Sequence, residues 1–197
     1  MKADPTPIPN HAAPQENIIL IGFMGVGKTT VSTRLGRMLR RTVLDTDQII
    51  AERLQASIPE IFERRGESFF RAAEHMLLSE LKRESGSVIS CGGGIILRSD
   101  NRRLLRSMGT VILLTATPET ICARVSQRTD LPLLSENRTL SHIQSMLKNR
   151  ERFYRACADL TISTDQKSVA RICAQILALL NRRDADAKTA HGNPHFP

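Results

Sequence analysis

The sequence contains no tryptophan, one tyrosine and six phenylalanines. It also lacks any apolar run of about 18 residues, the length that a membrane-spanning helix requires. Because 41% of its 197 residues are hydrophobic, the chain can still bury a sizeable core, built mainly from aliphatic side chains. We therefore expect one domain that does not cross a membrane.

Cysteine is also scarce, and its four positions are far apart: Cys91, Cys122, Cys157 and Cys173. Without a Cys-x-x-Cys pair, the sequence indicates neither a zinc site nor a disulfide framework. Buried, reduced thiols in a cytoplasmic protein are the expected alternative. Residues 1–16 lack the apolar segment of a signal peptide. We expect residues 1–16 and residues 181–197 to be disordered tails around a domain spanning residues 17–180.

Acidic residues are outnumbered, with 20 Asp and Glu against 28 Lys and Arg, which gives a formal net charge of +8. Such a charge suits either nucleic acid or a protein that handles ATP and an anionic metabolite. Because no arginine-rich run with interleaved aromatic residues occurs, we expect no nucleic-acid partner. We also expect a monomer.

Glycine is concentrated in the stretch from Ile18 to Thr30, which reads IILIGFMGVGKTT. An apolar segment runs into Gly22, four residues lead to Gly27, and Lys28 and Thr29 follow. This spacing, between a buried strand and a helix, is the phosphate-binding loop pattern. A chance match in an ordinary glycine-rich turn is disfavoured by the flanking strand and helix.

Each part of this loop has a chemical reason. Glycines let the backbone approach a polyphosphate, and the loop N–H groups and the helix N-terminus bind its oxygens. Lys28 is expected at the β- and γ-phosphates, and the hydroxyl of Thr29 at Mg²⁺. The predicted ATP-binding residues are Gly25, Val26, Gly27, Lys28, Thr29 and Thr30.

Apolar periodicity predicts alternating strands and helices along the rest of the chain. The predicted strands are 17–21, 43–44, 88–91, 110–114 and 160–163. The predicted helices are 29–39, 49–54, 57–65, 67–83, 101–107, 118–128, 140–154 and 169–180. Ser57 and Glu60 form a capping-box pattern, and Gly66 should break the helix that they begin. This alternation favours an α/β fold with a parallel sheet covered on both faces; residues 127–138 should form a loop or lid.

Asp45 and Asp47 follow the second predicted strand, at the sheet edge where parallel α/β folds place their chemistry. One carboxylate could hold Mg²⁺ while the other accepts a proton from an attacking hydroxyl. The alternative is that these residues only cap the next helix. We expect one of the two to act as the cap.

Three further features are candidates for binding an anionic substrate. Taken alone, Arg71 is expected to be a solvated residue paired with Glu74 on its own helix. The run Gly92-Gly93-Gly94 after a buried strand indicates close approach by a ligand. Arg150 falls on an apolar helix stripe, which indicates either a carboxylate or phosphate binder at a cleft or a snorkelling side chain.

Together these residues resemble the shikimate kinase family, from Glu16 to about Leu180. The resemblance rests on GFMGVGKT (22–29), LDTD (44–47), GESFFRAAE (66–74), CGGG (91–94) and NRERFY (149–154). It implies a three-layer P-loop NTPase fold with a five-stranded parallel sheet, helices on both faces and a mobile lid.

The resemblance also implies roles for single residues. Asp47, Arg71, the glycines 92–94 and Arg150 would bind shikimate, with both arginines on its carboxylate. Asp47 would face the acceptor hydroxyl, and Asp45 would join Thr29 at Mg²⁺. The implied reaction is the ATP-dependent phosphorylation of the 3-hydroxyl of shikimate.

The lid departs from the family pattern, because Leu131 stands where the family has an arginine before Pro-Leu-Leu. A lid arginine stabilises the transferring phosphoryl group. Arg124, Arg128 or Arg138 could supply that charge, and we assign it to Arg128. Two other functions stay open: a different small-metabolite kinase, such as a gluconate kinase, and a kinase-like module that binds ligands without turning them over.

Overall fold

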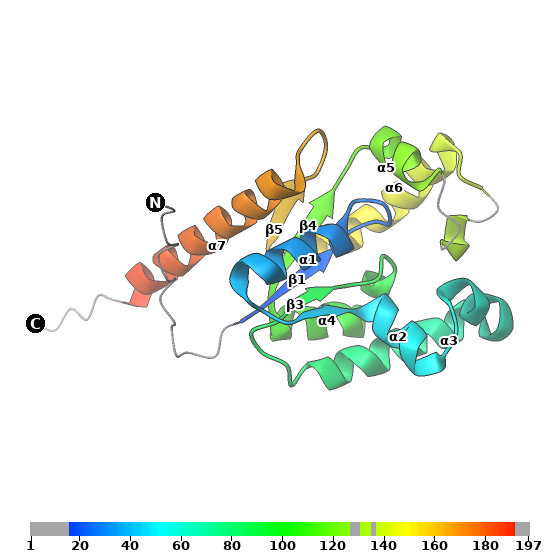
Figure 1. Ribbon diagram of the computed structural model, residues 1–197, viewed down its shortest axis with the longest axis horizontal. Helices are drawn as coiled ribbons and strands as arrows, with labels where there is room; N and C mark the ends of the chain where they lie inside the picture. Colours follow the sequence, from blue (N-terminus) through cyan, green and yellow to red (C-terminus); the bar gives the residue numbers. More distant parts are fainter. Residues whose placement is uncertain (1–15, 127–130, 135–136, 192–197) are drawn as a thin grey trace, which may run out of the picture.

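The computed structural model describes residues 16–126, 131–134 and 137–191 (Figure 1). The strands are β1 (Asn17–Ile21), β2 (Val43–Asp45), β3 (Val88–Ser90), β4 (Gly109–Thr115) and β5 (Leu160–Ser163). The helices are α1 (Lys28–Leu39), α2 (Thr46–Leu54), α3 (Ile58–Leu81), α4 (Ser99–Met108), α5 (Pro118–Val125), α6 (Leu140–Cys157) and α7 (Val169–His191). Two short 3₁₀ helices, η1 (Ile95–Leu97) and η2 (Pro132–Leu134), were not predicted.

The five strands form one sheet in the order β2-β3-β1-β4-β5, and all their pairings are parallel. In β1, Ile18 is opposite Val88 of β3 on one side and Thr110 of β4 on the other. The chain proceeds from β1 to one half of the sheet and later crosses to the other half. The loop after β1 therefore lies where the strand order reverses, the usual place for ligands in such sheets.

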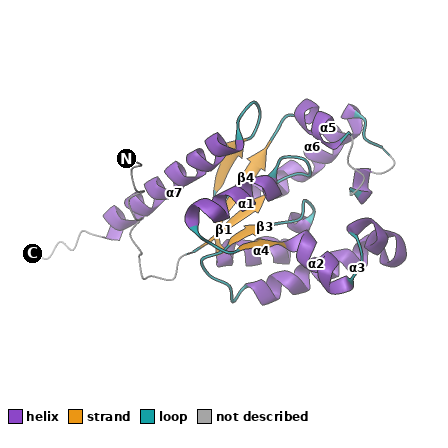
Figure 2. Ribbon diagram, viewed as in Figure 1, coloured by secondary structure: helices purple, strands orange, loops and turns teal. Residues whose placement is uncertain are grey.

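Helices lie on both faces of the sheet (Figure 2), and alternating strand residues pack into two separate cores, one on each face. Ile19 and Ile21 of β1 join the side chains of α3, α4 and the end of α6. Ile18 and Leu20 join those of α1, α5 and α7. Both faces are thus covered, which confirms the predicted three-layer α/β fold and explains why β1 is apolar at nearly every position.

Local signals at the start of α3 behave as predicted. The hydroxyl of Ser57 accepts a hydrogen bond from the Glu60 N–H, and the Glu60 carboxylate accepts one from the Ser57 N–H. Gly66 has φ 78° and ψ 166°, outside the helical region, and kinks α3. A residue with a side chain would be strained in this backbone conformation.

The end of α7 corrects the sequence-based boundaries. The helix continues to His191 instead of ending at Leu180, so residues 181–191 do not form the expected disordered tail. This stretch contains three Ala and two Arg and has no Gly or Pro before Gly192, which explains why a polar segment continues the helix. Helix α5 ends at Val125, short of the predicted Arg128.

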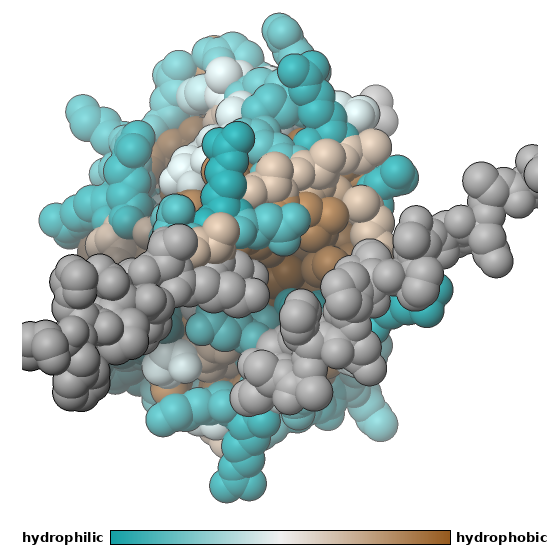
Figure 3. All heavy atoms as spheres, turned by 90° about the vertical axis from the view of Figure 1, so that its left-hand side faces the viewer, coloured by the Kyte–Doolittle hydropathy of each residue, from teal (hydrophilic) through white to brown (hydrophobic). Residues whose placement is uncertain are grey.

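The two ends of the molecule differ. The strands point toward α2, α3, α5 and α6, while α7 projects past the opposite end of the sheet (Figure 1). That opposite end shows hydrophilic side chains around a smaller hydrophobic area (Figure 3).

All four cysteines are free, and Cys91, Cys157 and Cys173 are buried, whereas Cys122 is half-buried. None of the helices in the described ranges is long and apolar enough to span a membrane.

Candidate active site

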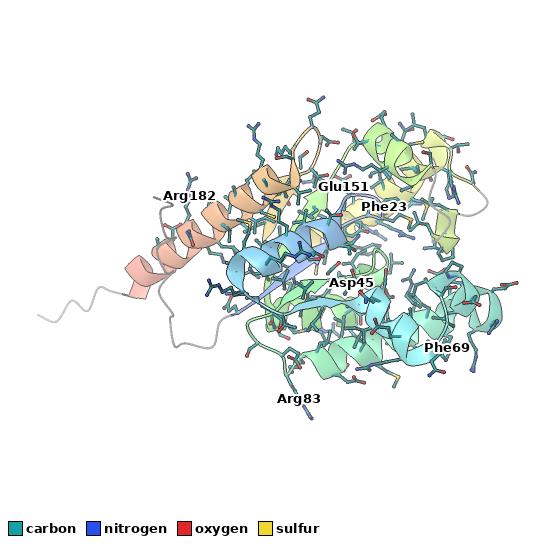
Figure 4. The ribbon with its side chains drawn as sticks, in the orientation of Figure 1. Phe23, Asp45, Phe69, Arg83, Glu151 and Arg182 are labelled. Carbon is teal, nitrogen blue, oxygen red and sulfur yellow. The ribbon has the colours of Figure 1, made fainter. Side chains whose placement is uncertain are left out.

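A cavity of about 480 Å³ lies at the carboxyl ends of the strands. Its walls come from the phosphate-binding loop, α2, α3, the glycine run after β3 and the Leu131–Leu133 segment. Asp45 and Phe23 both lie in this central region, beside the start of α1 (Figure 4). Elements far apart in sequence therefore meet around one cleft.

The phosphate-binding loop has the backbone that its sequence predicts. Gly25 and Gly27 have φ values of 82° and 96°, in the left-handed region that glycine adopts without strain. Lys28 Nζ donates hydrogen bonds to the carbonyl oxygens of Gly22 (2.9 Å) and Phe23 (3.0 Å). These contacts hold the ammonium group over the loop, at the start of α1.

Asp45 both caps α2 and contacts the phosphate side. Its Oδ1 accepts from the N–H groups of Asp47 (3.1 Å) and Gln48 (3.3 Å), as a helix N-cap does. Its Oδ2 accepts from the Thr29 hydroxyl at 2.9 Å. The prediction that one aspartate caps the helix is confirmed, and the capping residue keeps its second oxygen beside Thr29.

The pair of Thr29 and Asp45 fits Mg²⁺ chemically, because a hydroxyl and a carboxylate are hard oxygen ligands. Within the described ranges there is no cluster of three or more His, Cys, Asp or Glu that could hold a metal ion. This agrees with the usual mode of Mg²⁺ binding, in which one or two protein groups act together with substrate phosphates.

Asp47 points into the protein rather than capping the helix. In the described structure its Oδ1 is buried without a hydrogen-bond partner. Burial, with the Asp45 charge as a second cause, raises the pKa of Asp47 from 3.8 to about 6. A carboxylate with a pKa near the working pH and an oxygen without a partner is suited to accept a proton.

Arg71 is held by two carboxylates of its own helix. Its Nη1 contacts Glu74 Oε2 and its Nη2 contacts Glu67 Oε1, both at 2.7 Å. The alternative of a solvated arginine is wrong, because the Arg71 side chain is only 13% exposed and that of Glu74 is fully buried. The pairing with Glu74 that this alternative assumed does occur.

Glu74 is a site residue that sequence reasoning did not assign. Burial raises its pKa from 4.5 to about 7, although the neighbouring Arg71 opposes this shift. In the described structure its Oε1 has no hydrogen-bond partner. The available signal was its position three residues after Arg71, which places both side chains on one helix face.

The three glycines leave room for three different neighbours. A Cβ at position 92 would overlap Asp47, and one at position 94 would overlap the Arg71 guanidinium group. A Cβ at position 93 would lie 3.3 Å from the Met24 N atom of the phosphate-binding loop. The Gly92 N–H also donates to the Thr46 hydroxyl (2.9 Å), which ties the run to the start of α2.

Arg150 is buried, with 8% exposure, and its guanidinium carbon lies 5.6 Å from the centre of the Phe23 ring. Its Nη1 is buried without a hydrogen-bond partner in the described structure, so the snorkelling alternative is wrong. Arg150 is not among the residues that line the cleft. Its guanidinium group stacks on the Phe23 ring. One helical turn later, the Tyr154 hydroxyl donates to the Gly93 carbonyl oxygen at 2.5 Å.

The arginines near Leu131 differ in their surroundings. Leu131 itself lines the cleft. Arg124 contacts the loop, with Nη1 3.4 Å from the carbonyl oxygens of Gly25 and Val26. Arg138 instead donates to the carbonyl oxygens of Leu134 and Ser126, each at 3.0 Å. Arg128, the arginine chosen from the sequence, lies outside the described residues.

A second cavity, of about 310 Å³, lies beside the phosphate-binding loop. Gly25, Val26 and Thr30 line it together with Arg124, Thr164 and Lys167. The sequence analysis did not select Thr164 or Lys167, because no recognisable motif marks the turn between β5 and α7. Val26 lines this smaller cavity but not the larger cleft, whereas Thr30 lines both.

Comparison with known proteins gives a consistent result. The family model described as shikimate kinase matches residues 24–181. A shikimate kinase of Geobacter metallireducens is 44% identical over 85% of this chain and 93% of its own length. A shikimate kinase of Dehalococcoides mccartyi is 43% identical over 82% of this chain and 92% of its own length.

Solved structures agree with the sequence comparison. The shikimate kinase of Acinetobacter baumannii, solved in complex with shikimate, has a TM-score of 0.83 and is 36% identical, covering 86% of this chain and 94% of its own. A gluconokinase of Sinorhizobium meliloti has a TM-score of 0.56 at 15% identity, covering 90% of this chain and 98% of its own, so it shares the fold alone. By family model, sequence identity and fold, the chain belongs to the shikimate kinase family.

Proposed function

We propose that this protein transfers the γ-phosphoryl group of ATP to the 3-hydroxyl of shikimate, giving shikimate 3-phosphate and ADP. ATP is the phosphate donor of the family. The observation that carries the proposal is the meeting, around one cleft, of a phosphate-binding loop with Asp47, Arg71 and the glycine run. The phosphate-binding loop suits the phosphate donor, and Asp47, Arg71 and the glycine run suit an anionic acceptor with a hydroxyl group.

The proposed chemistry depends mainly on positioning and charge neutralisation. The loop N–H groups and Lys28 bind the phosphates, and Thr29 and Asp45 would hold Mg²⁺. When bound, this ion neutralises phosphate charge. The substrate hydroxyl oxygen forms a bond to the γ-phosphorus as the bond to the ADP oxygen breaks. The electron pair of that bond leaves with ADP, and the hydroxyl proton goes to Asp47.

The acid side recognises the substrate through fixed cations. Arg71 is oriented by Glu67 and Glu74, so its guanidinium group loses little freedom on binding a carboxylate. Arg150 contributes an Nη1 donor without a protein partner among the described residues. The glycine run provides space for the ring of the acid.

The smaller cavity is proposed to hold the part of the nucleotide that extends beyond its phosphates. Its position beside Gly25 and Thr30 supports this assignment. Arg124, near the end of α5, is the candidate to supply charge near the transferring group, since it already contacts the loop, whereas Arg138 donates to the carbonyl oxygen of Leu134. Arg128 stays a proposal from the sequence alone.

The protein is further proposed to act as a monomer. No nucleic acid takes part in the proposed reaction. The four free thiols suit a reducing compartment such as the cytoplasm.

A coupled assay of ADP release tests the proposed function, with shikimate and gluconate as competing acceptors. We expect ADP release with shikimate and little with gluconate, because gluconate offers no ring to the glycine run. Preferential turnover of gluconate would overturn the substrate assignment. Leu131 favours a second candidate, a module that binds both ligands without turnover. Binding of ATP and shikimate without ADP release would support that module.

A further inference from the structure

Phe23 contacts both cations on which the proposed function depends. Its carbonyl oxygen accepts from Lys28 Nζ at 3.0 Å. Its ring lies below the guanidinium group of Arg150, with 5.6 Å between the ring centre and the guanidinium carbon. Phe23 is 2% exposed, so the contact with buried Arg150 is shielded from water, whereas the contact with Lys28 is partly buried at the edge of the cleft.

The ring has an electrostatic role at Arg150. A buried guanidinium group is costly unless it is paired. In the described structure Arg150 Nη1 has no hydrogen-bond partner. Tyr154 hydrogen-bonds to the Arg150 side chain. The electron-rich face of Phe23 adds a cation–π contact, which is strongest where water is excluded.

The surroundings leave Phe23 little freedom to move independently of the substrate-binding elements. Tyr154, one helical turn after Arg150, donates to the Gly93 carbonyl oxygen at 2.5 Å. Gly93 in turn packs against the loop, since a Cβ there would lie 3.3 Å from Met24 N and 3.5 Å from Gly22 O. Helix α6, the glycine run and the loop therefore meet at Phe23.

We propose that Phe23 is a positioning residue that couples nucleotide binding to binding of the acid substrate. This inference rests on the proposed function. Nucleotide phosphates compete with the Phe23 carbonyl oxygen for Lys28 Nζ, which changes how residue 23 is held. The ring then holds Arg150 for the substrate carboxylate. Two ligands that order the same residue bind with positive cooperativity, and the coupling is equal in both directions.

The test replaces the ring while keeping an apolar side chain of similar size. Phe23→Leu removes the electron-rich face, and Phe23→Tyr retains it. A separate cavity of about 430 Å³, lined by Phe23, Leu147 and Tyr154, offers space for the added hydroxyl. The matched control is Phe153→Leu on α6, the helix that carries Arg150. This change removes an aromatic ring that contacts Arg102 (4.9 Å) and Arg152 (4.6 Å) away from the cleft.

The measurement is calorimetric titration of shikimate, without nucleotide and with saturating ADP and Mg²⁺. In the wild type we expect ADP to tighten shikimate binding. In Phe23→Leu we expect about tenfold weaker shikimate binding in the presence of ADP, equivalent to about 1.4 kcal/mol. The affinity for ADP alone should stay within about twofold. Phe23→Tyr and Phe153→Leu should retain the wild-type ratio of the two shikimate affinities.

Steady-state kinetics of the same variants provide a second readout, in which KM for shikimate should rise more than kcat falls. Equal coupling in the wild type and Phe23→Leu would overturn the inference, as would equal loss in Phe23→Leu and Phe23→Tyr, which would indicate packing alone. If Phe23→Leu does not fold, Phe23→Tyr and Phe23→Met provide the same comparison. A wild type that binds ADP but not shikimate would overturn the proposed function as well.

Discussion

On the phosphate side of the cleft, the groups offered to a ligand belong to one continuous loop and the first residues of α1. On the acid side they are side chains from α2 and α3, together with the glycine run after β3, and Arg150 of α6 lies outside the cleft lining. The phosphate side needs a backbone shape, which glycine spacing encodes locally. The acid side needs charges kept out of water, and these depend on partners from distant elements.

The two sides of the cleft also differ in their electrostatics. Asp45 and Lys28 have hydrogen-bond partners on the phosphate side. On the acid side, oxygens of Asp47 and Glu74 are buried without partners in the described structure, and the pKa values of both carboxyls are raised by burial. Unpaired polar groups of this kind cost stability, which supports the proposed role of the acid side in binding rather than in folding.

The largest expected effect comes from Asp47→Asn, which removes the proposed proton acceptor. We expect kcat to fall by about 100- to 10,000-fold, with shikimate affinity changing far less. The same substitution removes a buried charge, so the melting temperature should not decrease. ADP-release assays measure kcat, and calorimetry measures shikimate affinity. A change in affinity alone would contradict the assigned role.

The pH dependence of the wild type provides a related check. Because burial raises the pKa of Asp47 to about 6, the carboxyl is protonated at acidic pH and cannot accept the substrate proton. The value of kcat/KM for shikimate should therefore rise with pH through about 6 and then level off. With ATP saturating at every pH, a flat profile of kcat/KM between about pH 5 and 7 would exclude Asp47 as the acceptor.

The next effect tests the phosphate side. Lys28→Met should lower kcat/KM by about 100- to 1,000-fold, because it removes a charge aimed at the transferring phosphates. The fold depends little on this side chain, so the melting temperature should stay within a few degrees. Lys82→Met, at an exposed lysine after α3, is the control and should change neither quantity. Near wild-type turnover in Lys28→Met would place the nucleotide elsewhere.

Substitution of Arg71 tests the acid side separately. Arg71→Ala should weaken shikimate binding by about 10- to 100-fold and leave ATP affinity nearly unchanged. The change also leaves Glu74 buried without its cation, so we would make it in a Glu74→Gln background as well. Loss of shikimate affinity in both backgrounds indicates direct binding. Loss in the first background alone would mean that Arg71 only stabilises the fold.

A smaller effect is expected at Leu131. Leu131→Arg should raise kcat by less than about tenfold if Arg124 already supplies charge near the loop, with little change in substrate affinity. In an Arg124→Ala background the same substitution should restore much more of the lost activity. Arg138→Ala should have a weaker effect than Arg124→Ala, because Arg138 faces lid carbonyl oxygens. Equal effects of the two alanine variants would contradict this assignment.

The smallest effect concerns stability and comes from Glu74. Its pKa is 4.5 in the unfolded chain and about 7 in the fold, so the native state retains a proton that the unfolded state loses. The stability contributed by this group is present below pH 4.5 and is lost as pH rises to about 7. The melting temperature of Glu74→Gln should therefore increase relative to that of the wild type across this range.

Glu67→Gln provides the matched control for this comparison. Glu67 also pairs with Arg71, but its side chain is 47% exposed. Glu67→Gln therefore removes an ion pair with Arg71 without changing a fully buried carboxyl group. A constant difference between Glu74→Gln and the wild type from pH 4.5 to 7 would show that Glu74 is not protonated in the fold.

What could be predicted from the sequence follows the same division. The loop from Gly22 to Thr29, the Ser57–Glu60 capping box and the break at Gly66 depend on neighbouring residues, and all three are found as predicted. The burial of Glu74 and the stacking of Arg150 on Phe23 depend on residues far away in sequence. Local patterns could suggest charged candidates but could not show which of them would be enclosed.

The boundaries that were missed have a similar explanation. The segment after Leu180 was expected to be disordered because it is polar and contains two prolines, yet α7 continues to His191, before either proline. Helix propensity and the absence of Gly and Pro were sufficient there. Tertiary contacts determine the 3₁₀ turn Pro132–Leu134, since Leu134 is fully buried. No periodicity in a three-residue segment could have indicated it.

The glycine run after β3 also limits how this protein can evolve. Every amino acid other than glycine carries a Cβ, and that atom would overlap Asp47 at position 92 and Arg71 at position 94. Any single missense change in these two codons therefore displaces a charged group of the cleft. We expect a saturation library selected for growth on this activity to retain glycine at both positions. An organism under inhibitor pressure would have to acquire resistance through other parts of the cleft, such as the Leu131 segment.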